Sequence, residues 1–393
     1  MQTSYETQQR LKCSRFSTES GAEEYYIVAT AREGISFFEA IDEIFALYEA
    51  ALIENGLEQT TLQMIRFYLS DITNDFPKLA ESALFNYVKN GAVSLVGQTP
   101  VNGGTLGIIA YHIKSNNGYF SQKVNNNLKN YKNQNVFSAG KNYSMVWNTC
   151  LVDNTSKNSE QQTVGIFDKT KSFLDNHSMT IRNNTVRTWI YCRDVDNNYA
   201  GMVKARRELF DTIGLTHKTR YIASTGIEGK TVDPGCLIVM DALSIENICE
   251  EQLIRIEAPE NLSSTHHYGV TFERGTRVRF GDRSHLHISG TASIDPAGNI
   301  LFPGDVRNQL QRTIDNVEAL LASQNADLTS MQYLILYMRD PKSYPLIEDI
   351  ISLRIPSDVP LIAVEGPVCR PGWLVEIEGV GIIHDNNEFP VFE

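Results

Sequence analysis

The sequence predicts an α+β chain made of three copies of one unit, and three observations lead to this fold class. The same order of elements occurs three times along the 393 residues: a helix, a strand, a second helix and a pair of apolar strands. In each copy the first strand ends in a similar tetrapeptide, at 68–71 (YLSD), 191–194 (YCRD) and 337–340 (YMRD). The final aspartates are 194 − 71 = 123 and 340 − 194 = 146 residues apart, so the copies have similar lengths.

The first helix of each copy is predicted from its apolar spacing. Between residues 39 and 53, apolar side chains recur at helical intervals and form one wide face, and Asn55-Gly56 is a usual end signal. Equivalent helices are predicted over 164–174 and 306–321. The strand that follows each helix is predicted at 64–69, 186–192 and 333–338.

The closing strand pairs are predicted from short apolar runs, at 93–96 with 105–113, 221–225 with 236–242, and 361–364 with 373–380. A sheet covered by helices on one face must bury its other face. Three such units can bury these faces against each other, which predicts a compact pseudo-threefold molecule. Clefts where units meet are where ligands usually bind.

Changes of composition suggest the limits of the units. We expect unit boundaries at 1–150, 151–258 and 259–393. An Asn/Lys-rich segment at 114–141 is predicted to be an insertion of the first unit that forms an exposed hairpin or loops.

Composition excludes several classes of partner. The chain has 35 Lys+Arg and 47 Asp+Glu, a formal charge of −12, with no basic run to bind nucleic acid or an anionic membrane. No apolar run approaches the ~18 residues of a membrane span, and the N-terminus lacks the order of a signal peptide. We therefore expect a soluble, cytoplasmic protein. Its six cysteines are dispersed and predicted to be reduced.

No motif indicates a cofactor or metal. G-x-S-x-G, P-loop and G-x-G-x-x-G patterns do not occur, and His285 and His287 share a strand face without a third ligand at motif spacing. We predict a cofactor-free protein with no metal site.

The third copy resembles a known family. Residues 287–300 (HISGTASIDPAGNI), 304–321 (GDVRNQLQRTIDNVEALL) and 374–379 (LVEIEG) closely resemble the RidA/YjgF family of homotrimeric imine deaminases, over about 285–383. The first two copies resemble it weakly, by the order of their elements. The resemblance implies chorismate mutase-like modules forming a pseudo-trimeric barrel within one chain.

A closer resemblance, over about 160–383, is to the chorismatases, which hydrolyse chorismate and carry RidA-like modules in one chain. It rests on short blocks: 187–189 (RTW), Tyr199 with 205–206 (AR), 223–227 (ASTGI), 288–293 (ISGTAS) and 369–378 (CRPGWLVEIE). The resemblance implies that Glu376 is the catalytic carboxylate. It also implies that Cys369 is the cysteine of members that form 3-hydroxybenzoate rather than a dihydrodiol.

The sequence departs from both families at specific places. RidA proteins hold the substrate carboxylate with an arginine, and counting back from Glu376 places Leu361 there, which cannot replace a bidentate clamp. This disfavours deamination. Compared with chorismatases the chain is longer, the first copy shows no motif, and 371–373 (PGW) replaces a turn expected to be smaller and more polar.

Chorismate is a dicarboxylate with an enol ether, so its site needs cations and an acid that protonates the vinyl carbon. Glu376 and Glu378 flank Ile377 on a strand and point to one face. An apolar cleft would raise the pKa of a glutamate and make it a general acid, which we assign to Glu376. The alternative is that one of the two glutamates caps backbone or pairs with an arginine between units.

Two arginines are predicted to bind the substrate carboxylates. Arg187 lies in an otherwise apolar strand, so its charge must be paired if it is buried. The alternative is a structural ion pair with Asp194 or Glu208. Arg206 and Arg207 are adjacent on a helix and cannot both face the cleft, and the resemblance favours Arg206.

The remaining predicted site residues have a functional and a structural interpretation. Tyr199 could donate a hydrogen bond to a substrate oxygen, or be an ordinary interface tyrosine. Gly226 would let a ligand approach the backbone while the Thr225 hydroxyl donates, or the two form a plain bend. The Cys369 thiol could assist ring chemistry, or be an inert buried cysteine.

The sequence thus predicts a monomeric chorismatase-like hydrolase that acts on a small molecule. Its products would be pyruvate and 3-hydroxybenzoate, or a dihydroxycyclohexadiene carboxylate in place of the latter. The alternatives are a non-catalytic RidA-like protein that binds a small aromatic acid or imine, and a RidA-type deaminase. A ribonuclease is disfavoured by the charge of −12.

Overall fold

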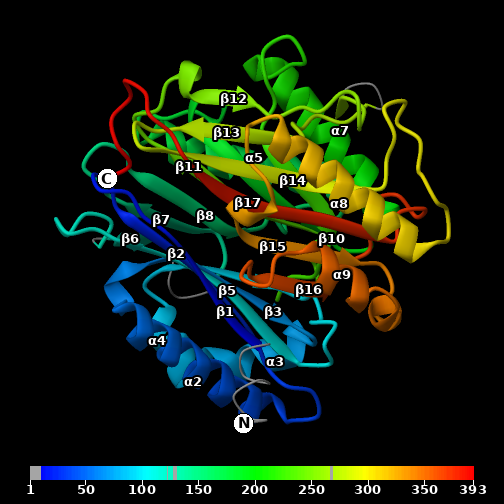
Figure 1. The fold of residues 1–393 in the computed structure, drawn as a ribbon, viewed down its shortest axis with the longest axis horizontal. Helices are drawn as coiled ribbons and strands as arrows, with labels where there is room; N and C mark the ends of the chain where they lie inside the picture. Colours follow the sequence, from blue (N-terminus) through cyan, green and yellow to red (C-terminus); the bar gives the residue numbers. More distant parts are fainter. Residues whose placement is uncertain (1–9, 122, 127–130, 266–268) are drawn as a thin grey trace.

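The computed structural model describes residues 10–121, 123–126, 131–265 and 269–393, without the side chains of 123–126 (Figure 1). It contains three sheets. The first unit contains β1 (Leu11–Phe16), β2 (Glu23–Thr30), α2 (Phe37–Asn55), β3 (Leu62–Leu69), α3 (Ile72–Ala80), α4 (Ala83–Val88), β4 (Ala92–Val96) and β5 (Leu106–Lys114).

The second unit contains β6 (Lys123–Asn126), β7 (Gln134–Ser138), β8 (Met145–Leu151), α5 (Ser159–Asp175), α6 (Ile181–Asn184), β9 (Thr185–Cys192), α7 (Val195–Ile213), β10 (Ala223–Glu228) and β11 (Ile238–Ile245). The third unit contains β12 (Leu253–Arg255), β13 (Gly275–Arg279), β14 (Arg283–Ala292), α8 (Val306–Ala322), β15 (Met331–Met338), α9 (Glu348–Arg354), β16 (Leu361–Glu365) and β17 (Val375–His384). The helices and strands predicted from periodicity all occur near their predicted positions.

The three sheets share one topology. The strand orders β1-β2-β5-β3-β4, β7-β8-β11-β9-β10 and β13-β14-β17-β15-β16 are equivalent, with β6 and β12 added at two edges. In each sheet only the last pair of these orders is parallel, and all other neighbouring strands are antiparallel. The tyrosines of the three repeated tetrapeptides, Tyr68, Tyr191 and Tyr337, occupy the same strand of each sheet. The predicted threefold repeat of an α+β unit is therefore confirmed.

Sheet membership divides the chain at different points from those predicted. β6 and β7 form an antiparallel hairpin that pairs through β7 with β8, so the Asn/Lys-rich segment extends the second sheet. The first sheet ends at Lys114, and the boundary expected at 150 falls within the second sheet. Each unit begins with a pair of strands before its first helix, and the sequence division assigned the second unit's pair to the first.

The helix-free faces of the sheets meet in the middle of the molecule, where aromatic side chains from all three units join one core. Tyr26 of the first unit lies with its ring centroid 5.4 Å from that of Tyr333 in the third. The first unit's Tyr111 lies 6.3 Å from Trp147 of the second, and Trp147 stacks on Trp189 at 6.2 Å. The sheet face that each unit leaves uncovered by its helices is thus buried against the other units, as predicted.

The described residues do not form a closed barrel. Between sheets they make isolated bridges, such as Gly97 with Lys230 and Ile227 with Val368, and no continuous ladder. The predicted pseudo-trimeric barrel is therefore not confirmed, although three sheets of equivalent topology contribute to one core. No helix in the described part of the chain is long and apolar enough to cross a membrane.

Candidate active site

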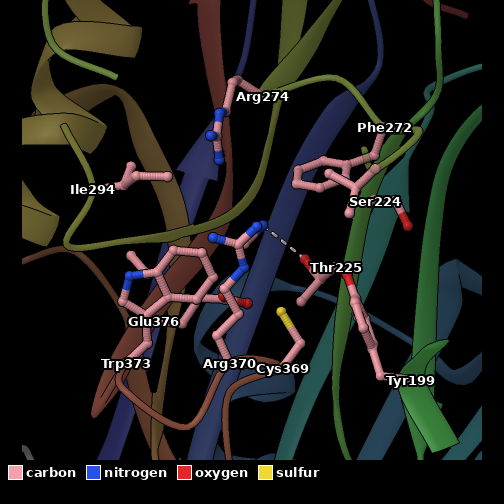
Figure 2. A pocket seen from close by; sticks show the side chains of 14 residues that line it. Tyr199, Ser224, Thr225, Phe272, Arg274, Ile294, Cys369, Arg370, Trp373 and Glu376 are labelled. Carbon is pink, nitrogen blue, oxygen red and sulfur yellow. Dashed lines mark hydrogen bonds between the residues drawn. The ribbon is translucent and has the colours of Figure 1, made fainter. Parts of the chain in front are cut away.

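A cavity lies where the second and third units meet, between β10 on one side and β14 and β17 on the other (Figure 2). It is lined by Tyr199, Ser224, Thr225, Gly226, Val270, Phe272, Arg274, Gly290, Ala292, Ile294, Cys369, Arg370, Trp373 and Glu376. Five of the seven predicted site residues are thus brought together from segments up to 177 positions apart (376 − 199).

Two glycines make room for the cavity. A Cβ atom at Gly290 would lie 2.1 Å from Oε1 of Glu376, so any other residue there would displace this carboxyl group. A Cβ atom at Gly226 would lie 2.9 Å from the Tyr199 ring. Gly226 therefore serves the site by admitting the tyrosine ring beside the strand.

The interface between the first and second units lacks these features at the equivalent positions. Counting from the repeated tyrosines and the strand pairing, Gly226, Gly290 and Glu376 correspond to Leu95, Cys150 and Val239. Cys150 is buried, and its Sγ accepts a hydrogen bond from the backbone N–H of Leu95 at 3.3 Å. The thiol fills the place that the Glu376 carboxyl occupies in the candidate site.

At the interface between the third and first units, the residues equivalent to Gly226, Gly290 and Glu376 are Ala363, Val28 and Gly107. The two glycines and the glutamate therefore occur together at one of the three equivalent interfaces. The candidate site is therefore placed at the interface between the second and third units.

Glu376 is the acid of the cavity. Its side chain is 5 % exposed, and no hydrogen bond or ion pair to its carboxyl is found within the described residues. Burial, reinforced by the charge of Glu378, raises the pKa of Glu376 to about 8, against the opposing influence of Arg274 and Arg187. The carboxyl group is consequently protonated at neutral pH, as a general acid requires.

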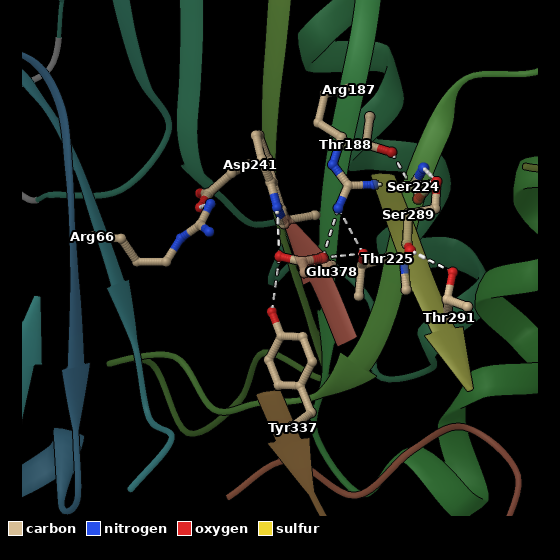
Figure 3. A network of polar contacts seen from close by, with 12 residues as sticks. Arg66, Arg187, Thr188, Ser224, Thr225, Asp241, Ser289, Thr291, Tyr337 and Glu378 are labelled. Carbon is tan, nitrogen blue, oxygen red and sulfur yellow. Dashed lines mark hydrogen bonds and ion pairs between the residues drawn. The ribbon is translucent and has the colours of Figure 1, made fainter. Parts of the chain in front are cut away.

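Glu378 lies beneath the cavity in a dense hydrogen-bond network (Figure 3). It is fully buried and accepts hydrogen bonds from Arg187 at 2.6 Å, the Trp189 indole at 2.9 Å, the Tyr337 hydroxyl at 3.1 Å, and the Thr225 hydroxyl. One of the two glutamates was expected, as an alternative, to pair with an arginine between units, and Glu378 forms such a pair with Arg187 of the second unit.

This network changes the interpretation of Arg187. The guanidinium was predicted to clamp a substrate carboxylate, but it bonds to Glu378, to Thr225 at 2.7 Å and to Ser289 at 3.4 Å, and it does not line the cavity. The structural alternative is correct in kind, although the partner is neither Asp194 nor Glu208. A buried cation takes the nearest buried carboxylate, and that carboxylate comes from another unit.

The Thr225 hydroxyl belongs to the same network. It donates to Glu378 and accepts from Arg187 and from the Gly290 N–H at 2.9 Å. The hydroxyl is therefore occupied by the scaffold instead of being directed to a ligand, although the residue lines the cavity floor.

Arg206 lies one layer behind the cavity lining. It is 1 % exposed and donates from Nε to Thr271 at 3.1 Å and from Nη1 to Ser224 at 3.3 Å, with Tyr199 and Cys369 beside it. No carboxylate pairs with it in the described ranges, and burial lowers the pKa of the guanidinium. Its charge is thus available to attract an anion into the cavity.

The arginines that line the cavity were missed from the sequence. Arg274 donates from Nε and Nη2 to the Ser263 carbonyl at 3.1 and 3.0 Å. The guanidinium of Arg370 lies 5.1 Å from the ring centroid of Trp373, whose indole N–H donates to the Ser293 carbonyl at 3.0 Å. Arg370 could have been found beside Cys369 in the C-terminal block, whereas the loop that carries Arg274 has no distinguishing pattern.

Cys369 and Tyr199 face the cavity together (Figure 2). Burial, together with the neighbouring Glu376, raises the pKa of the Cys369 thiol to about 12. The cysteine is therefore a neutral thiol, able to exchange a hydrogen bond but not to act as a thiolate nucleophile.

Comparisons with known proteins agree with the fold. The Endoribonuclease L-PSP family matches residues 278–383. The 3-hydroxybenzoate synthase of Streptomyces hygroscopicus is 24 % identical over 220 residues, which cover 49 % of this chain and 62 % of that protein. A crystal structure of a chorismatase superposes with a TM-score of 0.65 and 17 % identity, covering 93 % of this chain and 100 % of that one. RidA from the Antarctic bacterium Psychrobacter covers 33 % of this chain and 99 % of its own at 17 % identity, with a TM-score of 0.29.

The comparisons show similarity at two levels. The third unit matches the L-PSP family over residues 278–383, in agreement with the RidA-like sequence of β14, α8 and β17. Along nearly its whole length the chain has the fold of a chorismatase, so the predicted resemblance is confirmed. The match to the curated relative spans about three fifths of that protein's length.

Proposed function

We propose that this chain converts chorismate, cleaving its enolpyruvyl ether with Glu376 as the general acid. The observation that carries the proposal is the buried Glu376 carboxyl, which holds its proton at neutral pH and faces a cavity with arginines at its border. The relative named 3-hydroxybenzoate synthase supports the substrate class.

The reaction begins with the proton of Glu376. This proton adds to the methylene carbon of the enol ether, whose π electrons form the new C–H bond and leave positive charge on the carbon attached to oxygen. The Glu376 carboxylate, formed at that moment, stabilises the cation and then takes a proton from the water that adds to it. The resulting hemiketal breaks its bond to the ring oxygen, which takes the proton that Glu376 received from the water. The hemiketal hydroxyl gives its own proton back to Glu376 as the carbonyl of pyruvate forms.

The ring product depends on one molecule of water. Simple hydrolysis yields a dihydroxycyclohexadiene carboxylate, which keeps both ring oxygens, whereas 3-hydroxybenzoate has lost one water from that diol. Cys369 lines the same cavity as Glu376 and is a neutral thiol. We assign it to the aromatisation step, with 3-hydroxybenzoate as the product.

The substrate carboxylates need cations. Arg274 and Arg370 line the cavity, and Arg206 adds an unneutralised charge behind Ser224. A guanidinium binds a carboxylate through two parallel N–H groups, so these three residues are suited to a dicarboxylate. Tyr199 would donate to a remaining substrate oxygen.

The decisive experiment mixes purified protein with chorismate and follows pyruvate enzymatically and the ring product by chromatography. We expect pyruvate with the wild type and with Glu348→Gln, a control in the exposed first turn of α9, but none with Glu376→Gln. Equal rates in the wild type and Glu376→Gln would refute the general acid. Chorismate that binds but stays intact would instead favour a RidA-like binding protein, and ammonia release from an imine would favour a deaminase.

The proposal includes a single-chain assembly that acts in the cytoplasm. Because the three units already supply the three sheets of the core, the chain should elute as a monomer of 44.2 kDa. A stable trimer of this chain in a scattering measurement would contradict that.

A further inference from the structure

The proposed mechanism gives no role to Glu378, the buried acid that is next to Glu376 on the same face of its strand. Glu378 lies two residues after Glu376 on β17 and is completely inaccessible to solvent. Its carboxyl group accepts four hydrogen bonds, from Arg187, Trp189, Tyr337 and Thr225, and every one of these groups acts as a donor.

Such a set of donors stabilises the ionised form of a carboxyl group. The guanidinium of Arg187 adds a positive charge at 2.6 Å, and the indole N–H of Trp189 can only donate. Glu378 is therefore held in a buried ion pair with Arg187, while Glu376 beside it has neither a donor nor an ion pair in the described ranges. Residues two apart on a strand share one face, so the two carboxyl groups lie within the reach of a strong like-charge interaction.

The same network supports the floor of the cavity. Thr225, held by Glu378 and Arg187, accepts the backbone N–H of Gly290 at 2.9 Å. Gly290 is the residue on which the Glu376 carboxyl rests. Glu378 can thus influence Glu376 in two ways. Its carboxyl group acts electrostatically, and its hydrogen bond with Thr225 supports the Gly290 backbone that Glu376 contacts.

We propose that Glu378 is a positioning residue that keeps the proton on Glu376 until substrate accepts it and holds Thr225 and Gly290 in place beneath it. The inference rests on the proposed function of Glu376 as the acid. Glu378 itself touches no substrate, because Thr225 lies between it and the cavity.

Other charged and titratable groups also surround Glu376. The Tyr199 hydroxyl faces the same cavity, and the Arg206 guanidinium lies behind the cavity lining. Arg187 on β9 and Arg274 before β13 favour loss of the proton, and the Cys369 thiol before β17 is neutral. Arg370 also lines the cavity. Arg187 is largely neutralised by its contact with Glu378, so the loss of Glu378 removes a negative charge and exposes a positive one. Both changes act in the same direction on Glu376.

The chain contains a matched control for this role. At the interface between the first and second units, Asp241 occupies the position of Glu378 and pairs with Arg66 at 3.0 Å and with Ser94. It is 1 % exposed, so its removal breaks an equally buried network. The residue equivalent to Glu376 is here Val239, so no carboxyl group stands in the place of the proposed acid, and the neighbouring titratable group is the Cys150 thiol.

The test compares the wild type with Glu378→Gln and Asp241→Asn. The pH dependence of kcat/KM for pyruvate release should show an alkaline limb that reports the Glu376 proton. We expect Glu378→Gln to move this limb to lower pH by about one unit or more, the usual effect of a neighbouring like charge. Asp241→Asn should lower stability to a similar degree and leave the limb unmoved. An unmoved limb in Glu378→Gln, with stability lost as in Asp241→Asn, would show a structural role only and overturn the proposal.

Two additions keep the test decisive. If Glu378→Gln does not fold, the double variant Arg187→Met/Glu378→Gln leaves neither charge buried alone, and its limb should move in the same direction by less. Infrared titration of the Glu376 carboxyl, with Glu376→Gln subtracted, follows the proton without turnover. If no pyruvate forms, the proposed function fails, but the infrared midpoint still decides whether Glu378 controls the protonation of Glu376.

Discussion

Replacing Glu376 by glutamine should make the protein more stable as it makes it inactive, and the size of the gain should depend on pH. An ordinary glutamate releases its proton near pH 4.5, which is the behaviour expected in the unfolded chain, whereas the pKa of buried Glu376 is about 8. Between these values the folded state binds more protons than the unfolded state. The free energy of unfolding of the wild type therefore falls as pH rises.

The magnitude follows from the difference in pKa. Each pH unit between 4.5 and about 8 costs the wild type about 1.4 kcal/mol. The accumulated cost is about 3 kcal/mol at pH 7 and levels off at about 5 kcal/mol above pH 8. Glutamine has nearly the same shape and no proton to lose, so Glu376→Gln should escape this cost. The variants should be equally stable near pH 4.5 and diverge steadily above it.

Urea unfolding, followed by tryptophan fluorescence at several values between pH 4.5 and 9, measures this difference. Trp373 and Trp189 are buried, so their emission should report unfolding. Denaturation midpoints that separate progressively with pH, at constant slope, would agree with a buried protonated Glu376. A constant difference between the variants across the whole range would refute the reasoning, since it would mean that Glu376 titrates normally.

Three further outcomes are expected. Gly290→Ala places a methyl group 2.1 Å from the Glu376 carboxyl and should lower pyruvate release by about 100-fold or more. Gly235→Ala should leave pyruvate release unchanged, because Gly235 is exposed and a Cβ atom there would lie 3.3 Å from the nearest atom. Equal rates of pyruvate release in the two variants would argue against this cavity as the active site. Arg206→Met should raise KM by about 10- to 100-fold, the value of a charged hydrogen bond. The variant should be as stable as the wild type or more stable, because Arg206 pairs with no carboxylate in the described ranges and its removal leaves no negative charge unpaired. An unchanged KM together with lowered stability would mean that Arg206 has a structural role only. Cys369→Ala should keep pyruvate release and shift the chromatographic ratio of ring products from 3-hydroxybenzoate to the dihydrodiol, and an unaltered ratio would remove the thiol from ring chemistry.

The elements of the fold were predictable because their signals are local. The apolar stripe of α2 and the short apolar strands β3, β9 and β15 depend on residues close in sequence, and a repeated order of such signals is a repeated unit. Unit boundaries were less predictable. A strand such as β8 has the same local signal whether it pairs with the sheet before it or after it, and only the pairing with β11 decides.

For the site, the sequence by itself determined which acid and thiol are the candidates, since Glu376 and Cys369 belong to one short block that resembles the chorismatases. It also determined that Glu376 and Glu378 share a face, because side chains alternate along a strand. Only the tertiary structure decided their different states. Glu378 meets Arg187 and Trp189 of another unit and is held in an ion pair, whereas Glu376 enters a cavity that Gly226 and Gly290 keep open, where burial raises its pKa to about 8. Protonation depends on burial and on neighbours in space, and here those neighbours come from strands of a different unit, which no local pattern specifies.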